Sequence, residues 1–73
     1  MAQLSLGESK WRMLRRVLRK KKFSYADARN MTRADKGHFE FLVGNGFFAT
    51  IGEDLYEVTD KGKATAELGL YEI

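Results

Sequence analysis

Residues 42–62, LVGNGFFATIGEDLYEVTDKG, contain the clearest signals of secondary structure, because the local residue pattern changes three times within them. The Asn-Gly pair at 45–46 is a typical helix stop, because glycine readily adopts the left-handed conformation that closes a helix. Residues 47–51 and 55–58 are two short runs of aromatic and β-branched residues. We therefore expect a helix that ends at this pair and leads into a β-hairpin with a three-residue loop at 52–54.

A C-terminal helix is expected after the hairpin. Thr59 is a favourable N-cap, and the pattern predicts a helix over 60–68 that Gly69 ends. The remaining tail, 70–73, is apolar for a chain end. Two interpretations of the tail stay open: the C-terminal helix and tail form the seam of a homodimer, or the tail packs back on the first helix.

Upstream of this stretch, the pattern S/T-x-x-D/E that is typical of a capping box occurs at 5–8, 24–27 and 32–35. Each match stands at a plausible helix start. The first helix would be amphipathic, with apolar residues on one half of the helical wheel and basic residues on the other. The three expected helices cover residues 8–22, 25–30 and 33–45.

These elements predict one hydrophobic core in a single domain, residues 1–73, of the α+β class and mainly α. The chain has 73 residues and no cysteine, so the core must stabilise the fold without disulfides. The expected core residues are Trp11, Leu14, Val17, Leu18, Phe23, Ala28, Phe39, Leu42, Val43, Phe47 or Phe48, Tyr56, Val58 and Leu68.

The order of three helices, a hairpin and a helix corresponds to a helix-turn-helix followed by a wing. Leu42-Val-Gly-Asn-Gly-Phe-Phe48 resembles a recognition helix that runs into a first wing strand. Tyr56-Glu-Val-Thr-Asp-Lys-Gly62 resembles a second wing strand that runs into a final helix. In this order and spacing, the strings resemble the winged helix-turn-helix superfamily, in particular MarR- and PadR-like bacterial DNA-binding domains.

The resemblance implies a small DNA-binding protein associated with transcription, in which the third helix enters the major groove. Arginine and lysine on that helix suit phosphate oxygens and guanine edges. The candidate nucleic-acid contacts are Arg33, Lys36, Gly37 and His38 on or beside the third helix, Arg29 after the second, and Arg12, Arg15, Arg16 and Arg19 on the first.

The charge is distributed unevenly. Residues 1–22 hold eight basic residues and one acid, a net +7, whereas residues 23–73 hold five basic residues and nine acids, a net −4. The expected wing carries Glu53 and Asp54 at its tip, where the DNA-binding family members usually have Arg or Lys. Most of the positive charge thus falls on the first helix. Its basic face has three interpretations: it binds nucleic acid in an unusual way, it docks an acidic protein partner, or it is only solvated.

Other function classes have little support in the sequence. His38 is the only histidine and there is no cysteine, which argues against a zinc site, and no nucleophile–base arrangement or phosphate-binding loop motif is present. We expect no enzyme activity and no cofactor. No apolar run approaches the ~20 residues of a membrane span. The absence of cysteine and of an export signal favours the cytoplasm.

Overall fold

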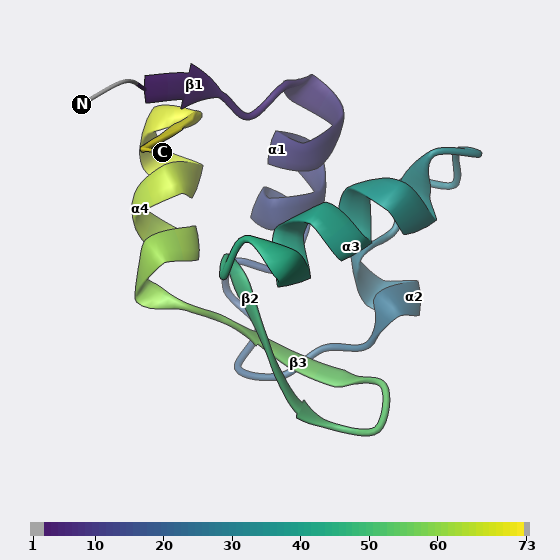
Figure 1. Ribbon diagram of the computed structural model, residues 1–73. Coiled ribbons are helices and arrows are strands. Elements are labelled where there is room, and N and C mark those ends of the chain that lie inside the picture. Colours follow the sequence, from purple (N-terminus) through teal and green to yellow (C-terminus); the bar gives the residue numbers. More distant parts are fainter. Residues whose placement is uncertain (1–2, 73) are drawn as a thin grey trace.

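The computed structural model describes residues 3–72 and contains four helices and two small antiparallel sheets. The helices pack around a common core, and one hairpin extends away from it (Figure 1). This confirms a small α+β domain. The elements are β1 (Gln3–Ser5), α1 (Glu8–Arg16), α2 (Tyr25–Ala28), α3 (Asp35–Gly44), β2 (Phe48–Gly52), β3 (Leu55–Val58), α4 (Asp60–Leu68) and β4 (Leu70–Glu72).

α1 is shorter than predicted, because it ends at Arg16 instead of at residue 22. The backbone of Phe23 forms a bridge with Tyr56 of the hairpin, with N–H to oxygen distances of 3.0 and 2.8 Å. A helix that continued to residue 22 would carry Phe23 away from this partner. The four successive cations at 19–22 also repel one another, which disfavours another helical turn.

The starts of α2 and α3 depend on paired hydroxyl and carboxyl side chains. At α2 the Asp27 carboxylate accepts from the Ser24 backbone N–H at 3.0 Å, and the predicted capping box is present. At α3 the prediction of a start at residue 33 is wrong. The Thr32 hydroxyl donates to the Asp35 carboxylate at 2.7 Å instead of accepting from a helix N–H, and the helix begins at Asp35.

The hairpin confirms both predicted strands but not the length of their loop. Gly52 belongs to β2 and pairs with Leu55, so only Glu53 and Asp54 connect the strands. A register irregularity between Thr50 and Gly52 accompanies this shorter turn. Asp54 takes a left-handed conformation, with φ +49°, which tightens the turn.

The ends of α3 and α4 follow the local signals. Gly46 and Gly69 both have positive φ, +81° and +69°, as a left-handed helix stop requires. Thr59 caps α4 by accepting from the Gly62 N–H at 3.0 Å. These two stops and this cap were correctly predicted.

The sequence patterns did not predict the sheet formed by β1 and β4. Its register pairs Leu4 with Tyr71 and Ser5 with Leu70. The Tyr71 ring lies edge-on to Phe47 and Phe41, at centroid distances of 5.4 and 6.0 Å. The tail therefore pairs with the N-terminal strand instead of packing on the first helix, and the homodimer seam stays a prediction.

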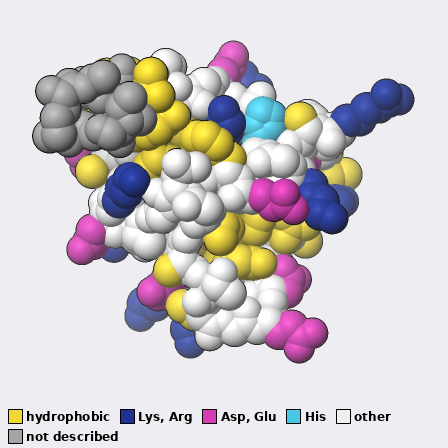
Figure 2. Space-filling view, viewed as in Figure 1, with side chains coloured by type: hydrophobic (Ala, Val, Ile, Leu, Met, Phe, Trp, Pro, Cys, Tyr) yellow, Lys and Arg dark blue, Asp and Glu magenta, His cyan; other side chains and the backbone are white. Residues whose placement is uncertain are grey.

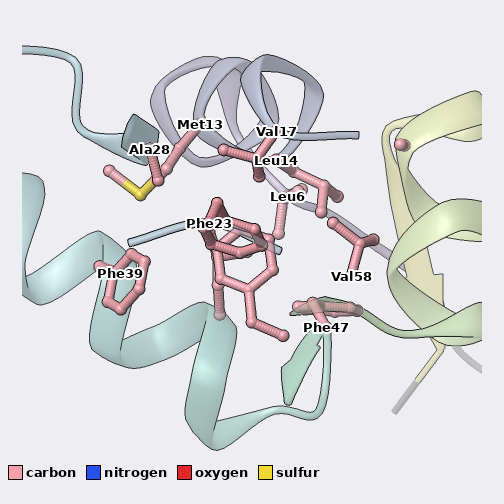
Figure 3. Packing of buried hydrophobic residues seen from close by; sticks show 12 residues of the cluster. Leu6, Met13, Leu14, Val17, Phe23, Ala28, Phe39, Phe47 and Val58 are labelled. Carbon is pink, nitrogen blue, oxygen red and sulfur yellow. The ribbon is translucent and has the colours of Figure 1, made fainter. Parts of the chain in front are cut away.

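The core is built around aromatic rings from three segments (Figure 3). Phe23 lies 4.7 Å from Phe48 and 6.5 Å from Phe39, centroid to centroid. The prediction of Leu68 as a core residue is wrong, since 68% of it is exposed at the last position of α4. The buried core residues are Leu6, Met13, Leu14, Val17, Phe23, Ala28, Phe39, Leu42, Phe47, Phe48, Val58 and Ala66. The predicted residues that are only partly buried and pack against this cluster are Trp11, Leu18, Val43 and Tyr56.

Candidate nucleic-acid interface

The predicted contacts of the third helix lie close together at the start of α3. Arg33 and Lys36 are exposed, Gly37 leaves open space around its Cα, and His38 is half-buried. Arg33 stands just before the helix instead of within it. On the face shown in Figure 2 the single histidine, in cyan, has a dark-blue basic side chain beside it.

Lys10 of α1 joins this group, although the sequence reasoning did not select it. A shallow pocket of about 380 Å³ lies here. Its lining residues are Lys10, Arg33, Ala34, Gly37, His38 and Phe41. The Lys10 ammonium lies 4.4 Å from the centre of the Phe41 ring and 3.5 Å from the backbone oxygen of Leu6. Lys10 lies two residues before Arg12, and the sequence pattern gives no sign that it is close to Arg33. The packing of α1 on α3 reveals its neighbours.

In the same region, the His38 side chain has a polar atom without a hydrogen-bond partner in the described part of the chain. Its Nδ1 atom is buried and has no hydrogen-bond partner among the described residues. Buried polar atoms in native proteins nearly always have a partner, whether protein, water or ligand. The pocket thus offers two cations to a polar ligand, and His38 beside them holds a buried ring nitrogen without a partner among the residues that the structure describes.

Asp35 holds the loop that presents Arg33. Only 2% of this residue is exposed. Burial raises the pKa of the Asp35 carboxyl, but hydrogen bonds from the Thr32 hydroxyl and from the backbone N–H groups of residues 30–32 outweigh burial and hold this pKa below its ordinary value. Met31, in a left-handed conformation with φ +66°, turns the chain so that these N–H groups converge on the carboxylate.

This arrangement predicts a specific loss of stability in acid. The pKa of Asp35 is lower in the folded chain than in the unfolded chain, where it is about 3.9. The ionised carboxylate therefore stabilises the fold above that pH, and this stabilisation disappears as pH falls through the folded value. In urea unfolding at a series of pH values below about 5, Asp35→Asn should show a shallower acid decline than the wild type. Glu53→Gln, an exposed carboxyl on the hairpin loop, should retain the wild-type slope. An unchanged slope in Asp35→Asn would contradict the role of the carboxylate.

The acidic hairpin tip has a structural explanation. The Asp54 carboxylate accepts from the backbone N–H of Tyr25, at 3.1 Å, at the first residue of α2. An anion is favourable at a helix N-terminus. The tip is thereby attached to α2, and Glu53 is the charge of the tip without this contact to α2.

Between α3 and the hairpin lies an aromatic hollow lined by Tyr25, Lys36, Phe39, Glu40 and Tyr56.

The basic residues of α1 do not form one free surface. Arg12 pairs with Glu8, and the Arg15 guanidinium lies 4.8 Å from the centre of the Trp11 ring. Arg16 donates to the Asn30 side chain at 3.0 Å, which ties α1 to the residue after α2. These three arginines therefore already have partners within the chain.

The last two predicted contacts lie apart from these. Arg29 is exposed at the C-terminal end of α2. Arg19 lies beyond α1 and lines a different cleft, with the lysines that follow it. The nine predicted residues thus fall into separate groups. The α3 group forms a pocket with Lys10, and Arg19 belongs to a different cleft.

Within residues 3–72, no three His, Asp or Glu side chains gather closely enough to hold a metal ion. None of the described helices has the length and apolar character that crossing a membrane requires. Comparisons with protein-family models, with curated proteins and with solved structures found no match to this chain. The local geometry is therefore the main guide to function.

Proposed function

We propose that this chain is a small winged helix-turn-helix protein that binds duplex DNA, with α3 as its recognition helix and a role in transcription. The element order, with α2 and α3 followed by the β2–β3 hairpin and then α4, is the order that the winged-helix resemblance implies. The pocket shared by Lys10 and Arg33 at the start of α3 carries the proposal. Two cations within one hollow suit a phosphate oxygen.

In this proposal the residues of the α3 region have different tasks. Arg33 and Lys10 contact the phosphate backbone and fix the orientation of α3. Lys36, one turn further along the exposed surface, reaches toward base edges, where lysine suits guanine. Glu40 is also exposed. Its carboxylate can only accept hydrogen bonds, from a donor such as the cytosine amino group, so it disfavours DNA sequences that place an acceptor opposite it.

The hairpin contributes little to affinity in this mode. Its tip carries Glu53 and an Asp54 carboxylate that is engaged with α2, and neither neutralises phosphate. With two cations on phosphates, the slope of log affinity against log salt should be about −2. A conventional basic wing would add further phosphate contacts and make this slope steeper.

Binding can be tested by fluorescence anisotropy with a labelled duplex of mixed sequence at several salt concentrations. We expect Arg33→Ala and Lys36→Ala each to weaken binding roughly fivefold. Only Arg33→Ala should also reduce the salt slope by about 1, because Arg33 contacts phosphate and Lys36 contacts base edges. Arg12→Ala is the matched control, because Arg12 points roughly 200° away from Lys10 around α1 and is paired with Glu8. It should bind like the wild type.

Two results would refute the proposal. One is the absence of any salt-sensitive binding to duplex DNA at low ionic strength, where phosphate contacts are strongest. The other is an equal loss of affinity in Arg12→Ala and in the α3 variants, since this would indicate only a general response to net charge. Circular dichroism of each variant, with its urea midpoint, confirms that the fold is retained.

A further inference from the structure

A second basic surface, away from α3, lies between the turn that follows α1 and the strand β3. This basic cleft, of about 470 Å³, is lined by residues 18–22 on one side and by Glu57, Val58 and Lys63 on the other. Figure 1 shows the turn after α1 behind β2, whereas the loop before α3 lies at the far right of the molecule. The two basic surfaces are therefore separate.

The basic cleft holds five cations and one acid. Arg19, the three lysines at 20–22 and Lys63 are all exposed. In the described part of the chain none of them forms an ion pair or a side-chain hydrogen bond, in contrast to the arginines of α1. Several like charges kept close together without partners repel one another and are complementary to an anionic ligand with several charges.

One wall of the cleft is the edge of β3 at Val58. In an antiparallel pair, the backbone N–H and C=O groups of successive residues point to opposite edges of the strand, so residues two apart share an edge. Tyr56 uses its outward N–H and C=O to bridge Phe23, so the groups of Val58 face the same side. No described residue forms a backbone hydrogen bond with Val58 on that side, where residues 21 and 22 line the cleft.

We propose that the basic cleft binds an extended acidic segment of a partner protein. Carboxylates of the segment pair with residues 19–22 and Lys63, while its main chain adds to the edge of β3 at Val58. A polypeptide can both donate to and accept from the open backbone groups. A phosphate backbone only accepts, and Glu57 on the rim repels it. The partly buried Leu18 side chain adds an apolar contact that a peptide side chain can use.

This proposal is independent of DNA binding by α3, and the test keeps the two apart. The probe is a fluorescein-labelled peptide of alternating glutamate and valine, which is acidic and favours an extended conformation. Its affinity is measured by anisotropy for the wild type, for the cleft variant Lys21→Glu/Lys22→Glu and for Lys36→Ala of α3. The labelled DNA duplex is titrated against the same three proteins.

We expect the cleft variant to bind the peptide about tenfold more weakly and Lys36→Ala to bind it normally. In ¹⁵N-edited NMR spectra of the wild type, the Val58 amide should shift on peptide addition and exchange more slowly with solvent. Equal peptide affinity in the wild type and the cleft variant would overturn the proposal. So would loss of DNA binding in the cleft variant without peptide binding by the wild type, because the cleft would then be a nucleic-acid contact.

Discussion

Replacement of Phe23 by alanine should destabilise this protein by about 3–5 kcal/mol, the largest loss that we expect from one side chain. Phe23 is 1% exposed, and its ring packs against those of Phe39, Phe48 and Tyr56 at centroid distances of 6.5, 4.7 and 6.0 Å. It joins the segment after α1 to both α3 and the hairpin. Its loss leaves a cavity that three separate elements would have to close together.

The size of this effect decides whether the chain folds at all. A domain of this length has a free energy of unfolding of roughly 4–11 kcal/mol. Phe23→Ala should therefore lower the urea midpoint severely or leave the chain unfolded at 25 °C. Phe23→Leu retains most of the apolar volume and should lose less, which keeps the comparison measurable if the alanine variant is unfolded.

Leu68→Ala is the matched control for the core. Leu68 has a hydrophobic side chain in α4, but 68% of it is exposed. Its truncation should change the free energy of unfolding by less than about 0.5 kcal/mol. Equal losses in Phe23→Ala and Leu68→Ala would contradict the observed packing.

Replacement of Gly62 by alanine should also be strongly destabilising, by about 3 kcal/mol or more. A Cβ atom at this position would lie 2.3 Å from the backbone oxygen of Phe47 and 2.9 Å from a methyl group of Val58. The Phe47 oxygen has little freedom to move, because it accepts from the Thr59 N–H at 3.0 Å and from the Thr59 hydroxyl at 3.1 Å. The start of α4 would have to separate from the segment between α3 and β2.

Gly44→Ala tests whether this effect depends on position. Gly44 lies in α3, and a Cβ there would meet nothing within 4 Å. Alanine is favoured over glycine in a helix by up to about 1 kcal/mol, so this variant should be as stable as the wild type or more stable. Urea unfolding of both variants measures the difference. A Gly62→Ala protein as stable as Gly44→Ala would show that α4 does not approach Phe47 this closely.

Short-range signals predicted much of the secondary structure correctly. Gly46 and Gly69 end helices with positive φ, and Thr59 starts α4, because each of these features depends on a few neighbouring residues. The end of α1 was predicted wrongly, since it depends on the bridge between Phe23 and a residue 33 positions further along the chain. The periodic pattern of residues 8–22 contains no information about that partner.

The candidate site shows the same division. Lys36 is exposed on α3, whose residues Phe39 and Leu42 point to the core, and Arg33 is exposed just before that helix. The proximity of Lys10 follows only from the packing of α1 on α3. Likewise, three arginines of the basic face expected on the first helix contact other residues of the chain. The cations at 19–22 form no ion pair among the described residues and lie next to β3.

Local residue patterns thus account for where most helices and strands of this protein begin, for its hairpin and for the concentration of positive charge before residue 23. Capping, turn geometry and periodicity act over a few residues, which is why they can be recognised without coordinates. Tertiary packing determined the pairing of β1 with β4, the end of α1 and the division of the positive charge into two separate surfaces. Each of these depends on contacts between residues distant in the chain, and such contacts form only when the whole core assembles.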